Sequence, residues 1–278
     1  MMNPPKISII TIVRNDCEGM VRTLTSVQNQ TFRDFEYIVV DGASTDGTHE
    51  FLVDNESQIN FLISEPDNGL YEAMNKGVDQ AFGAWAIFLN AGDVLATPET
   101  LSRAVAQIDK KNIVYFGRAI IEFTTGGGWI YPPRCISSKT CKYWLRNNLP
   151  NHQAMFFPRS FYQSNRYRLD LKISADSDYK KRAIAAKGYR FLDQTICYFA
   201  LDGVSSKRTI RSQVSQIIDR FNRLTGPQKY IDCPISIVKS FVRYGSYRLL
   251  GNASHLIIHW IKSRADCAEA NVRYWIAK

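Results

Sequence analysis

The chain has 278 residues, of which 45% are hydrophobic and 22% are charged, with 16 glycines and 10 prolines. This composition excludes a chain that is disordered, collagenous or of low complexity as a whole. The formal net charge is +9, and the whole excess lies after residue 202, in a segment with thirteen basic and four acidic residues. Such a basic segment suits nucleic acid, an anionic lipid surface or a phosphorylated substrate.

Six cysteines are present, and none forms a C-x-x-C pair, which argues against a zinc knuckle or a thioredoxin-type site. The sequence enters its first apolar run without the layout of a signal peptide. No uncharged apolar run approaches the ~20 residues of a membrane-spanning helix. We therefore expect free thiols in a reducing cytosol.

The first part of the chain alternates between apolar strands and amphipathic helices. Apolar, largely β-branched runs predict four strands, at residues 7–13, 35–40, 59–63 and 84–89, of which the first two are expected to be buried. The helical spacing of apolar side chains predicts helices between them, at residues 18–28, 48–53 and about 69–81. This alternation is typical of a mostly parallel, Rossmann-like sheet with helices on both faces, an α/β fold.

The later part of the chain is predicted to be more mixed. Thr97, Pro98 and Glu99 have the pattern of a helix start, with a cap, a proline and an early acid. Further strands are expected at residues 113–118, 119–131 (with a turn at 126–128), 152–157 and 189–199. Further helices are expected at residues 139–146, at 175–187 and over most of the chain beyond 203.

Polar residues follow three of the first four predicted strands. Residues 14–16 follow the first, Asp41 follows the second, and Asp93 comes shortly after the fourth. Because ligands bind at the carboxyl ends of strands in open α/β sheets, we expect these side chains to share one site. Asp41 could accept hydrogen bonds from a base or a ribose, and Asp93 could bind Mg²⁺ or Mn²⁺ through oxygen. Ordinary polar turns are the alternative, and no P-loop or G-x-G-x-x-G pattern follows the first strand.

Several motifs now become recognisable, in the order ISIITIVRND, FEYIVVDGASTDGT, SEPDNGLYEAMNKG, AWAIFLNAGD, HQAMFFP and SAD. Together they resemble glycosyltransferase family 2, which has the GT-A fold. The later motifs are similar to the branch that builds bacterial exopolysaccharides of the colanic-acid type. The resemblance covers residues 6–205.

The resemblance implies an inverting transfer of a sugar from a nucleoside diphosphate donor (UDP or GDP) to an acceptor hydroxyl, with Mn²⁺ or Mg²⁺ as cofactor. The implied acceptor is a glycan or a polyprenyl-diphosphate-linked intermediate of bacterial surface polysaccharide. Residues 1–93 would form the nucleotide-binding half and residues 94–218 the acceptor-binding half of a catalytic domain. A basic helical extension would follow at residues 219–278. The sequence is also compatible with a homo-oligomer.

Individual residues take their implied roles from their positions in these motifs. Asp176 is implied as the catalytic base, with a helix cap as the alternative, and Asp93 as the metal ligand. The implied nucleotide-binding residues are Thr11, Val13, Asn15, Asp41, Asp67, Asn75, Lys76 and Asn90. The implied contacts to the acceptor or the leaving diphosphate are His152, Gln153, Ser205 and Lys207. For His152, a purely structural role is an equal alternative to ligand contact. For Lys207, a solvated loop charge is the equal alternative.

The chain departs from the family pattern at two places. Asn90 and Gly92 stand where the family often has Asp, so a single carboxylate remains in that motif. Met74 stands where the family often has Arg, and Lys76 is the candidate substitute. The loss of acids motivates a second hypothesis, a catalytically inactive scaffold that binds nucleotide sugars.

Two other classes receive less support. A nucleic-acid binder would explain the basic segment, but no RRM, KH or helix-turn-helix pattern is found, so we expect no nucleic-acid partner. A sugar-nucleotide pyrophosphorylase would need a glycine-rich basic loop after the first strand, and residues 14–16 stand there instead.

Two amphipathic stretches in the basic segment, at residues 238–249 and 256–261, carry basic residues beside their apolar faces. They suit either helices packed on the catalytic domain or interfacial membrane helices. We expect the second, with the protein cytoplasmic and peripheral on the inner face of the cell membrane.

Overall fold

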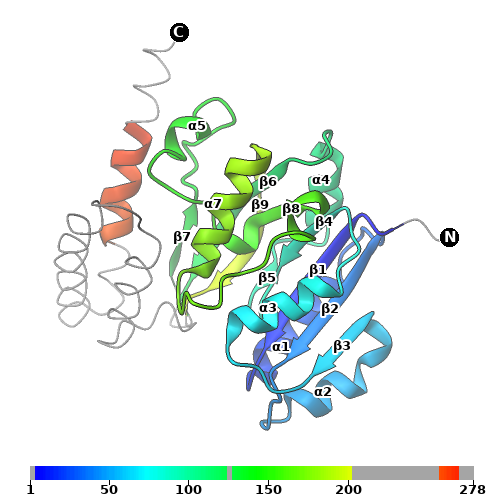
Figure 1. The fold of residues 1–278 in the computed structure, drawn as a ribbon. Helices are drawn as coiled ribbons and strands as arrows, with labels where there is room; N and C mark the ends of the chain where they lie inside the picture. The colour runs from blue at the N-terminus through cyan, green and yellow to red at the C-terminus, as the bar shows by residue number, and fades with distance from the viewer. Residues whose placement is uncertain (1–3, 124–126, 202–256, 269–278) are drawn as a thin grey trace.

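The computed structural model of the protein describes residues 4–123, 127–201 and 257–268. A twisted sheet runs through the molecule, with helices on both of its faces (Figure 1). Within the described ranges, no helix is both long enough and apolar enough to cross a membrane.

The strands and helices alternate along most of the chain. The strands are β1 (Ile7–Val13), β2 (Phe35–Asp41), β3 (Phe61–Ser64), β4 (Trp85–Phe88), β5 (Val94–Leu95), β6 (Val114–Glu122), β7 (Gly128–Tyr131), β8 (Met155–Pro158) and β9 (Tyr189–Ala200). The labelled α-helices are α1 (Cys17–Gln28), α2 (Thr48–Asp54), α3 (Leu70–Asp79), α4 (Thr100–Gln107), α5 (Cys141–Trp144), α6 (Arg159–Tyr162) and α7 (Ala175–Lys187). Two 3₁₀ turns, η1 (Glu56–Gln58) and η2 (His152–Ala154), and an α-helix over residues 257–268 complete the described elements.

The sheet has the strand order β3-β2-β1-β4-β8-β6-β9-β5, with β7 paired to β6. The first four strands in this order, β3, β2, β1 and β4, are parallel to one another, which confirms the parallel half that the sequence predicts. The second half is mixed, because β8 is antiparallel to both β4 and β6, and β9 is parallel to β6. The carboxyl ends of β1, β2 and β4 therefore lie at one edge.

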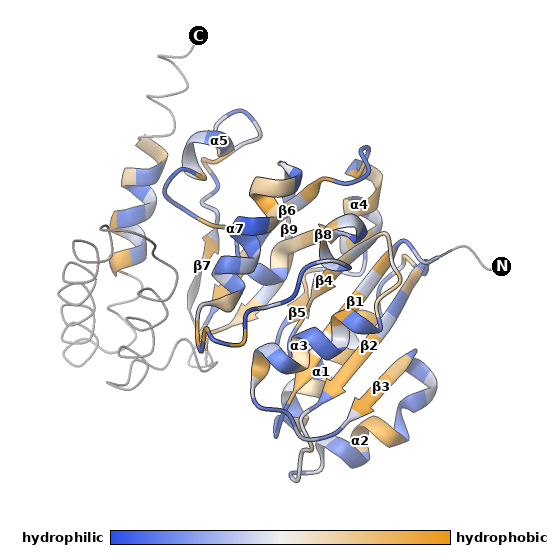
Figure 2. Cartoon of the chain, viewed as in Figure 1, coloured by the Kyte–Doolittle hydropathy of each residue, from blue (hydrophilic) through white to orange (hydrophobic). Residues whose placement is uncertain are grey.

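Neighbouring side chains of each strand pack into two apolar cores, one on each face of the sheet. Ile10 of β1 packs with residues of α3, α5, α6 and α7, whereas Ile9 packs with residues of α1, α2 and α4. Every residue of β1 is buried. This double coverage explains why the strand is a continuous apolar run rather than an alternating one, and the central strands are correspondingly orange in Figure 2.

Three predicted elements differ from the observed ones. Residues 152–154 form a 3₁₀ turn instead of the start of a strand, because the side-chain oxygen of Asn151 accepts a hydrogen bond of 3.0 Å from the backbone N–H of Gln153. The helix expected at Thr97 begins at Thr100. The helix expected at 139–146 is shorter, spanning Cys141–Trp144.

The cysteine prediction is wrong for one pair, because Cys135 and Cys267 form a disulfide across 132 residues of sequence. Cys17, Cys141 and Cys197 are free thiols. The disulfide joins helix 257–268 to the loop after β7. Residues 257–268 are helical as expected, whereas the rest of the predicted extension, the boundary at 218/219, Ser205 and Lys207 lie outside the described residues.

Candidate active site

A cavity of about 1520 Å³ opens where β1 and β4 end. It is lined on one side by the loops of the parallel half and on the other by residues 145–153, α7 and helix 257–268. The predicted site residues that line it are Val13, Asp67, Asn90, Asp93, His152, Gln153 and Asp176. Residues that the sequence analysis grouped from distant parts of the chain thus line one cavity.

The turn at residues 90–93 follows β4 and enters the cavity wall. Gly92 has a φ of +90°, a backbone conformation that residues with a Cβ rarely adopt. Thr23 on α1 fixes the turn, because its hydroxyl lies 2.8 Å from the carbonyl oxygen of Asp93 and accepts a hydrogen bond of 3.0 Å from the N–H of Gly92. Helix α1 is thus hydrogen-bonded directly to the turn.

Asp93 is the acid of this turn, and its side chain is nearly inaccessible, with 3% of the residue exposed. One carboxylate oxygen accepts a hydrogen bond of 3.1 Å from the backbone N–H of Ala200. Burial raises the pKa of Asp93 well above its usual value, and the nearby charge of Asp16 adds to this effect. A positive charge at this position would favour the ionised form.

The residues around Asp93 fit a hard divalent cation in part. The side-chain oxygen of Asn90 is buried and has no hydrogen-bond partner among the described residues. Within the same residues, no three His, Cys, Asp or Glu side chains gather into a metal site. Magnesium commonly takes one or two protein oxygens and completes its shell with substrate phosphates and water. Asn90 and Asp93 suit that arrangement.

Asp176 lies across the cavity, in the first turn of α7. The helix begins at Ala175 with Ser174 as its N-cap, so the alternative of Asp176 as the cap is wrong. The ammonium of Lys180 lies 3.1 Å from a carboxylate oxygen of Asp176 and donates to the carbonyl of Pro150 at 3.2 Å. Burial is the largest single effect on Asp176 and acts to raise its pKa, but the charge of Lys180, together with smaller effects of His152 and of hydrogen bonds from Lys180 and the Ser177 N–H, lowers the pKa overall. Asp176 is therefore ionised at neutral pH.

Asp178, two residues further along α7, has a different environment from Asp176. Its carboxylate accepts a hydrogen bond of 2.8 Å from Nε of Arg182, whose guanidinium also donates to the carbonyl of Arg166 at 2.7 Å. Asp178 is not among the residues that line the cavity. It therefore holds α7 against the preceding loop.

His152 lies at the cavity wall but is almost fully buried. Its Nε2 is 2.7 Å from the hydroxyl of Tyr167, and its ring packs on Phe88 with 4.8 Å between centroids. Burial, followed by the charge of Lys180, lowers the pKa of His152 to about 3, so the ring is neutral near pH 7. The neighbouring Gln153 lines the cavity and hydrogen-bonds Asp93.

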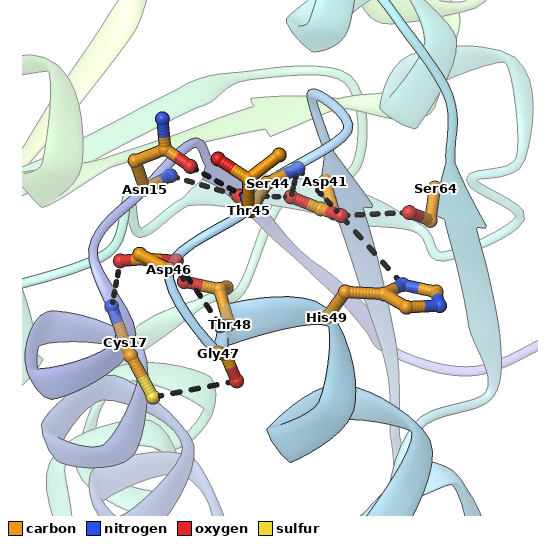
Figure 3. Close-up of polar contacts among 10 residues, drawn as sticks. All are labelled: Asn15, Cys17, Asp41, Ser44, Thr45, Asp46, Gly47, Thr48, His49 and Ser64. Carbon is orange, nitrogen blue, oxygen red and sulfur yellow. Dashed lines mark hydrogen bonds and ion pairs between the residues drawn. The ribbon is translucent and has the colours of Figure 1, made fainter.

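Asp41 organises the loop after β2 instead of lining the cavity (Figure 3). Its carboxylate accepts hydrogen bonds from the hydroxyls of Ser44 (2.5 Å) and Ser64 (2.7 Å). Asn15, with a φ of 52°, ties this loop to β1, because its N–H donates to the hydroxyl of Ser44 and its side-chain oxygen accepts from the N–H of Thr45, each at 2.8 Å. Both residues therefore shape the cavity edge indirectly.

Three further predicted nucleotide contacts are engaged inside the protein. Thr11 is fully buried and donates its hydroxyl to the carbonyl of Leu89 at 2.6 Å. Asn75 hydrogen-bonds both backbone groups of Tyr167, at 3.1 and 2.8 Å. Lys76 forms an ion pair of 2.7 Å with Glu65. None of the three is among the residues that line the cavity.

The structure adds Arg14, Asp16 and Arg22 to the donor side of the cavity. Asp16 caps α1 by accepting a hydrogen bond of 2.9 Å from the N–H of Gly19. A Cβ at Gly92 would lie 3.7 Å from both Asp16 and Arg22, so these charges stand beside the 90–93 turn. Arg14 and Asp16 belong to the polar cluster that the sequence marks after the first strand, whereas Arg22 looked like an ordinary surface residue of a helix.

Comparison with known proteins places this site in a family. The family model described as Glycosyl transferase family 2 matches residues 8–172. An uncharacterized glycosyltransferase of Mycobacterium tuberculosis is 33% identical over 214 residues, which are 75% of this chain and 80% of that protein.

Solved structures give the same fold. Staphylococcus aureus TarS 1–349 in complex with UDP-GlcNAc has a TM-score of 0.60 at 18% identity, over 95% of this chain and 81% of that chain. The mannosyltransferase PcManGT from Pyrobaculum calidifontis, in complex with GDP-Man and Mn²⁺, has a TM-score of 0.58 at 17% identity, over 99% and 88%. The architecture is thus the GT-A fold of glycosyltransferases. The chain belongs to glycosyl transferase family 2.

Proposed function

We propose that the protein is a metal-dependent, inverting glycosyltransferase that moves a sugar from a nucleoside diphosphate to an acceptor hydroxyl. The observation that carries this proposal is that Asp93 and Asp176 line the same cavity from different halves of the sheet. One acid stands beside a buried oxygen that has no partner among the described residues, and the other is ionised and partly exposed to the cavity.

The donor occupies the end of the cavity formed by β1, α1 and the 90–93 turn. Val13 and Asp67 border the space for the nucleoside, and Asn90 and Asp93 would hold Mn²⁺ or Mg²⁺ beside the diphosphate. The cation would neutralise negative charge that develops on the leaving diphosphate. Arg14 and Arg22 supply further positive charge at the same end. Two solved structures of this fold contain UDP-GlcNAc and GDP-Man with Mn²⁺, respectively, which supports a nucleotide-sugar donor of either base.

Asp176 acts as the general base. In a direct displacement, the acceptor hydroxyl loses its proton to a carboxylate as its oxygen attacks the anomeric carbon, and the bond to the diphosphate breaks on the opposite face. This single displacement inverts the anomeric configuration. Lys180 keeps Asp176 ionised and oriented through their 3.1 Å ion pair.

The acceptor is a lipid-linked or glycan intermediate of bacterial surface polysaccharide, a placement that rests on the sequence resemblance to the exopolysaccharide branch. Helix 257–268 supports a location on an anionic membrane. Its exposed face carries Ile257 (48% exposed), Trp260 (57%) and Ile261 (56%), and the guanidinium of Arg264 lies 4.4 Å from the Trp260 ring. Basic charge beside a tryptophan and isoleucines suits an interfacial helix.

A second candidate function, an inactive nucleotide-sugar-binding scaffold, is favoured by one observation. Asn90 and Gly92 leave Asp93 as the single carboxylate of the turn, which weakens the expected hold on a cation. Donor turnover separates the two candidates, because a scaffold binds the donor without releasing its sugar.

The proposal is tested by thermal-shift titration of the full chain with UDP, GDP and their sugar conjugates, with Mn²⁺ or with EDTA. A ligand at 100 times its dissociation constant should stabilise the protein by about 2.7 kcal/mol. The expected result is stabilisation by one nucleoside diphosphate that depends on Mn²⁺. Absence of stabilisation by every nucleotide would contradict the proposal.

A further inference from the structure

Three segments meet at the end of the cavity opposite the 90–93 turn. The ammonium of Lys262, in helix 257–268, donates to the side-chain oxygen of Asn148 at 2.6 Å. The ammonium of Lys180, in α7, donates to the carbonyl of Pro150 at 3.2 Å. Lys180 and Lys262 come from different helices, and each donates a hydrogen bond to the segment 148–150. Helix 257–268, which lies outside the family match, therefore stands close to the helix that carries Asp176.

Further contacts fix helix 257–268 in this place. The imidazole of His259 stacks on the indole of Trp129, with 4.7 Å between ring centroids. The disulfide between Cys135 and Cys267 anchors the C-terminal end of the helix. Since both ends of the helix are attached to the catalytic domain, Lys262 has a defined position at the cavity wall.

This wall carries an excess of positive charge. Its basic members on residues 145–153, α7 and helix 257–268 are Arg146, Lys180, Lys181 and Lys262, and Lys172 in the loop before α7 also lines the cavity. Asp176 is the single acid among the described lining residues there, and its charge is paired with Lys180. A site with several cations from separate elements suits an anion that carries more than one charge, such as a phosphate or diphosphate.

We propose that Arg146 and Lys262 bind a phosphate or diphosphate group on the acceptor, which makes helix 257–268 a specificity element of the enzyme. This inference rests on the proposed transfer reaction and assigns two residues of this chain to the recognition of the acceptor. Arg146 lies two residues before Asn148, the residue that Lys262 binds, and its exposed guanidinium stands 5.6 Å from the Tyr143 ring. Arg146 is thus part of the segment that Lys262 contacts, both residues line the cavity, and an anion bound there would bring the acceptor hydroxyl to the cavity that Asp176 lines.

The test uses the full chain saturated with the nucleoside diphosphate that stabilises it, so that the donor end is filled, with Mg²⁺ in excess over all phosphate. Inorganic pyrophosphate, farnesyl diphosphate and uncharged farnesol are then titrated by calorimetry. Both diphosphates should bind, and farnesol should not. Tighter binding of farnesyl diphosphate identifies a lipid-borne group, whereas equal binding identifies a diphosphate on a water-soluble acceptor, and both results support the proposal.

Variants assign the binding to the two cations. Arg146→Gln and Lys262→Gln should each weaken pyrophosphate binding about fivefold, the upper range for a partly exposed ion pair. Lys262→Arg, which keeps the charge, should retain affinity, and Lys111→Gln, an exposed residue outside the cavity lining, is the matched control. Unchanged pyrophosphate affinity in both glutamine variants, or equal binding of farnesol, would overturn the inference. Failure of the nucleoside diphosphate titration on the same samples would instead count against the proposed donor site.

Discussion

The hydroxyl of Thr23 lies 2.8 Å from the carbonyl oxygen of Asp93, although 70 residues separate them in the chain. The same hydroxyl accepts the N–H of Gly92, and the Thr23 side chain is fully buried. A residue of α1 thus sets the backbone of the turn that presents the proposed metal ligand. Thr23 positions the site without lining the cavity.

Thr23→Val keeps the shape of the side chain and removes its hydroxyl. The N–H of Gly92 then loses its partner in a buried place, which should lower the free energy of unfolding by about 1–3 kcal/mol. The looser turn should also weaken Mn²⁺-dependent nucleotide binding. Urea unfolding and nucleotide titration measure the two effects.

Thr25→Val is the matched control, because Thr25 lies on the same helix with its exposed hydroxyl bound to the carbonyl of Val21 at 2.7 Å. It should leave both unfolding and nucleotide binding nearly unchanged. Equal losses of nucleotide affinity in the two variants would show that Thr23 has no special role.

Asp93→Asn should stabilise the metal-free protein at neutral pH. Burial raises the pKa of Asp93 in the folded state, so the folded protein holds this proton to a higher pH than the unfolded chain does. This group therefore lowers stability as the pH rises from its unfolded pKa of about 3.9 through its folded pKa. The greater stability of metal-free Asp93→Asn over the wild type should be present at pH 7.5 and disappear near pH 4.

When nucleotide is present, Mn²⁺ should make the wild type more stable than Asp93→Asn, because the cation favours the ionised carboxylate that only the wild type has. Thermal melts across pH, with and without Mn²⁺ and nucleotide, measure this reversal. Asp54→Asn, at an exposed position of α2, is the control. A wild type that gains no more from Mn²⁺ than Asp93→Asn does would remove Asp93 from the metal site.

Lys180→Met should move the acid limb of the pH–rate profile to higher pH. Lys180 lowers the pKa of Asp176 against the opposing effect of burial, so removal of its charge leaves the base protonated over a wider acidic range. Initial rates between pH 4 and pH 8 measure the shift. An acid limb at the wild-type position, in a variant whose fold is verified by circular dichroism, would mean that Asp176 does not limit the rate there.

Cys135→Ser should add one titratable thiol to the unreduced, denatured protein, because it releases Cys267 from the disulfide. Cys141→Ser, at a free thiol, should instead remove one. The cross-link closes a long loop, and its loss should cost about 2–5 kcal/mol of stability in that part of the structure. Equal thiol counts in wild type and Cys135→Ser would contradict the pairing.

The parallel half of the sheet could be predicted because β1, β2 and β4 are almost wholly buried and therefore read as apolar runs, as in residues 7–13, whereas the edge strand β3 is partly exposed. The two-residue β5 and the four-residue α6 are too short to carry a period of their own. The turn at residues 152–154 was predicted as a strand because its apolar neighbours were visible in the sequence, whereas the hydrogen bond from the N–H of Gln153 to the side chain of Asn151 was not.

The site was predictable to a different degree at each residue. Asp93 and Asp176 could be placed from motif positions, because each follows or begins a recognisable element. The inward direction of Asp41 depends on Ser44 and Ser64, and the second of these comes from a neighbouring strand. Thr23 looked like any polar helix residue, since nothing local shows that its hydroxyl meets a turn 70 residues later.

The central claim is that the ionised Asp176 promotes sugar transfer from a metal-bound nucleotide sugar. The most direct measurement is the release of nucleoside diphosphate from its sugar conjugate, with Mn²⁺ and a lipid-linked acceptor extract, by wild type and by Asp176→Asn. The account predicts turnover by the wild type that EDTA abolishes, and a decrease of about 10²–10⁴-fold in Asp176→Asn with donor affinity retained. Turnover by Asp176→Asn at the wild-type rate would contradict the account.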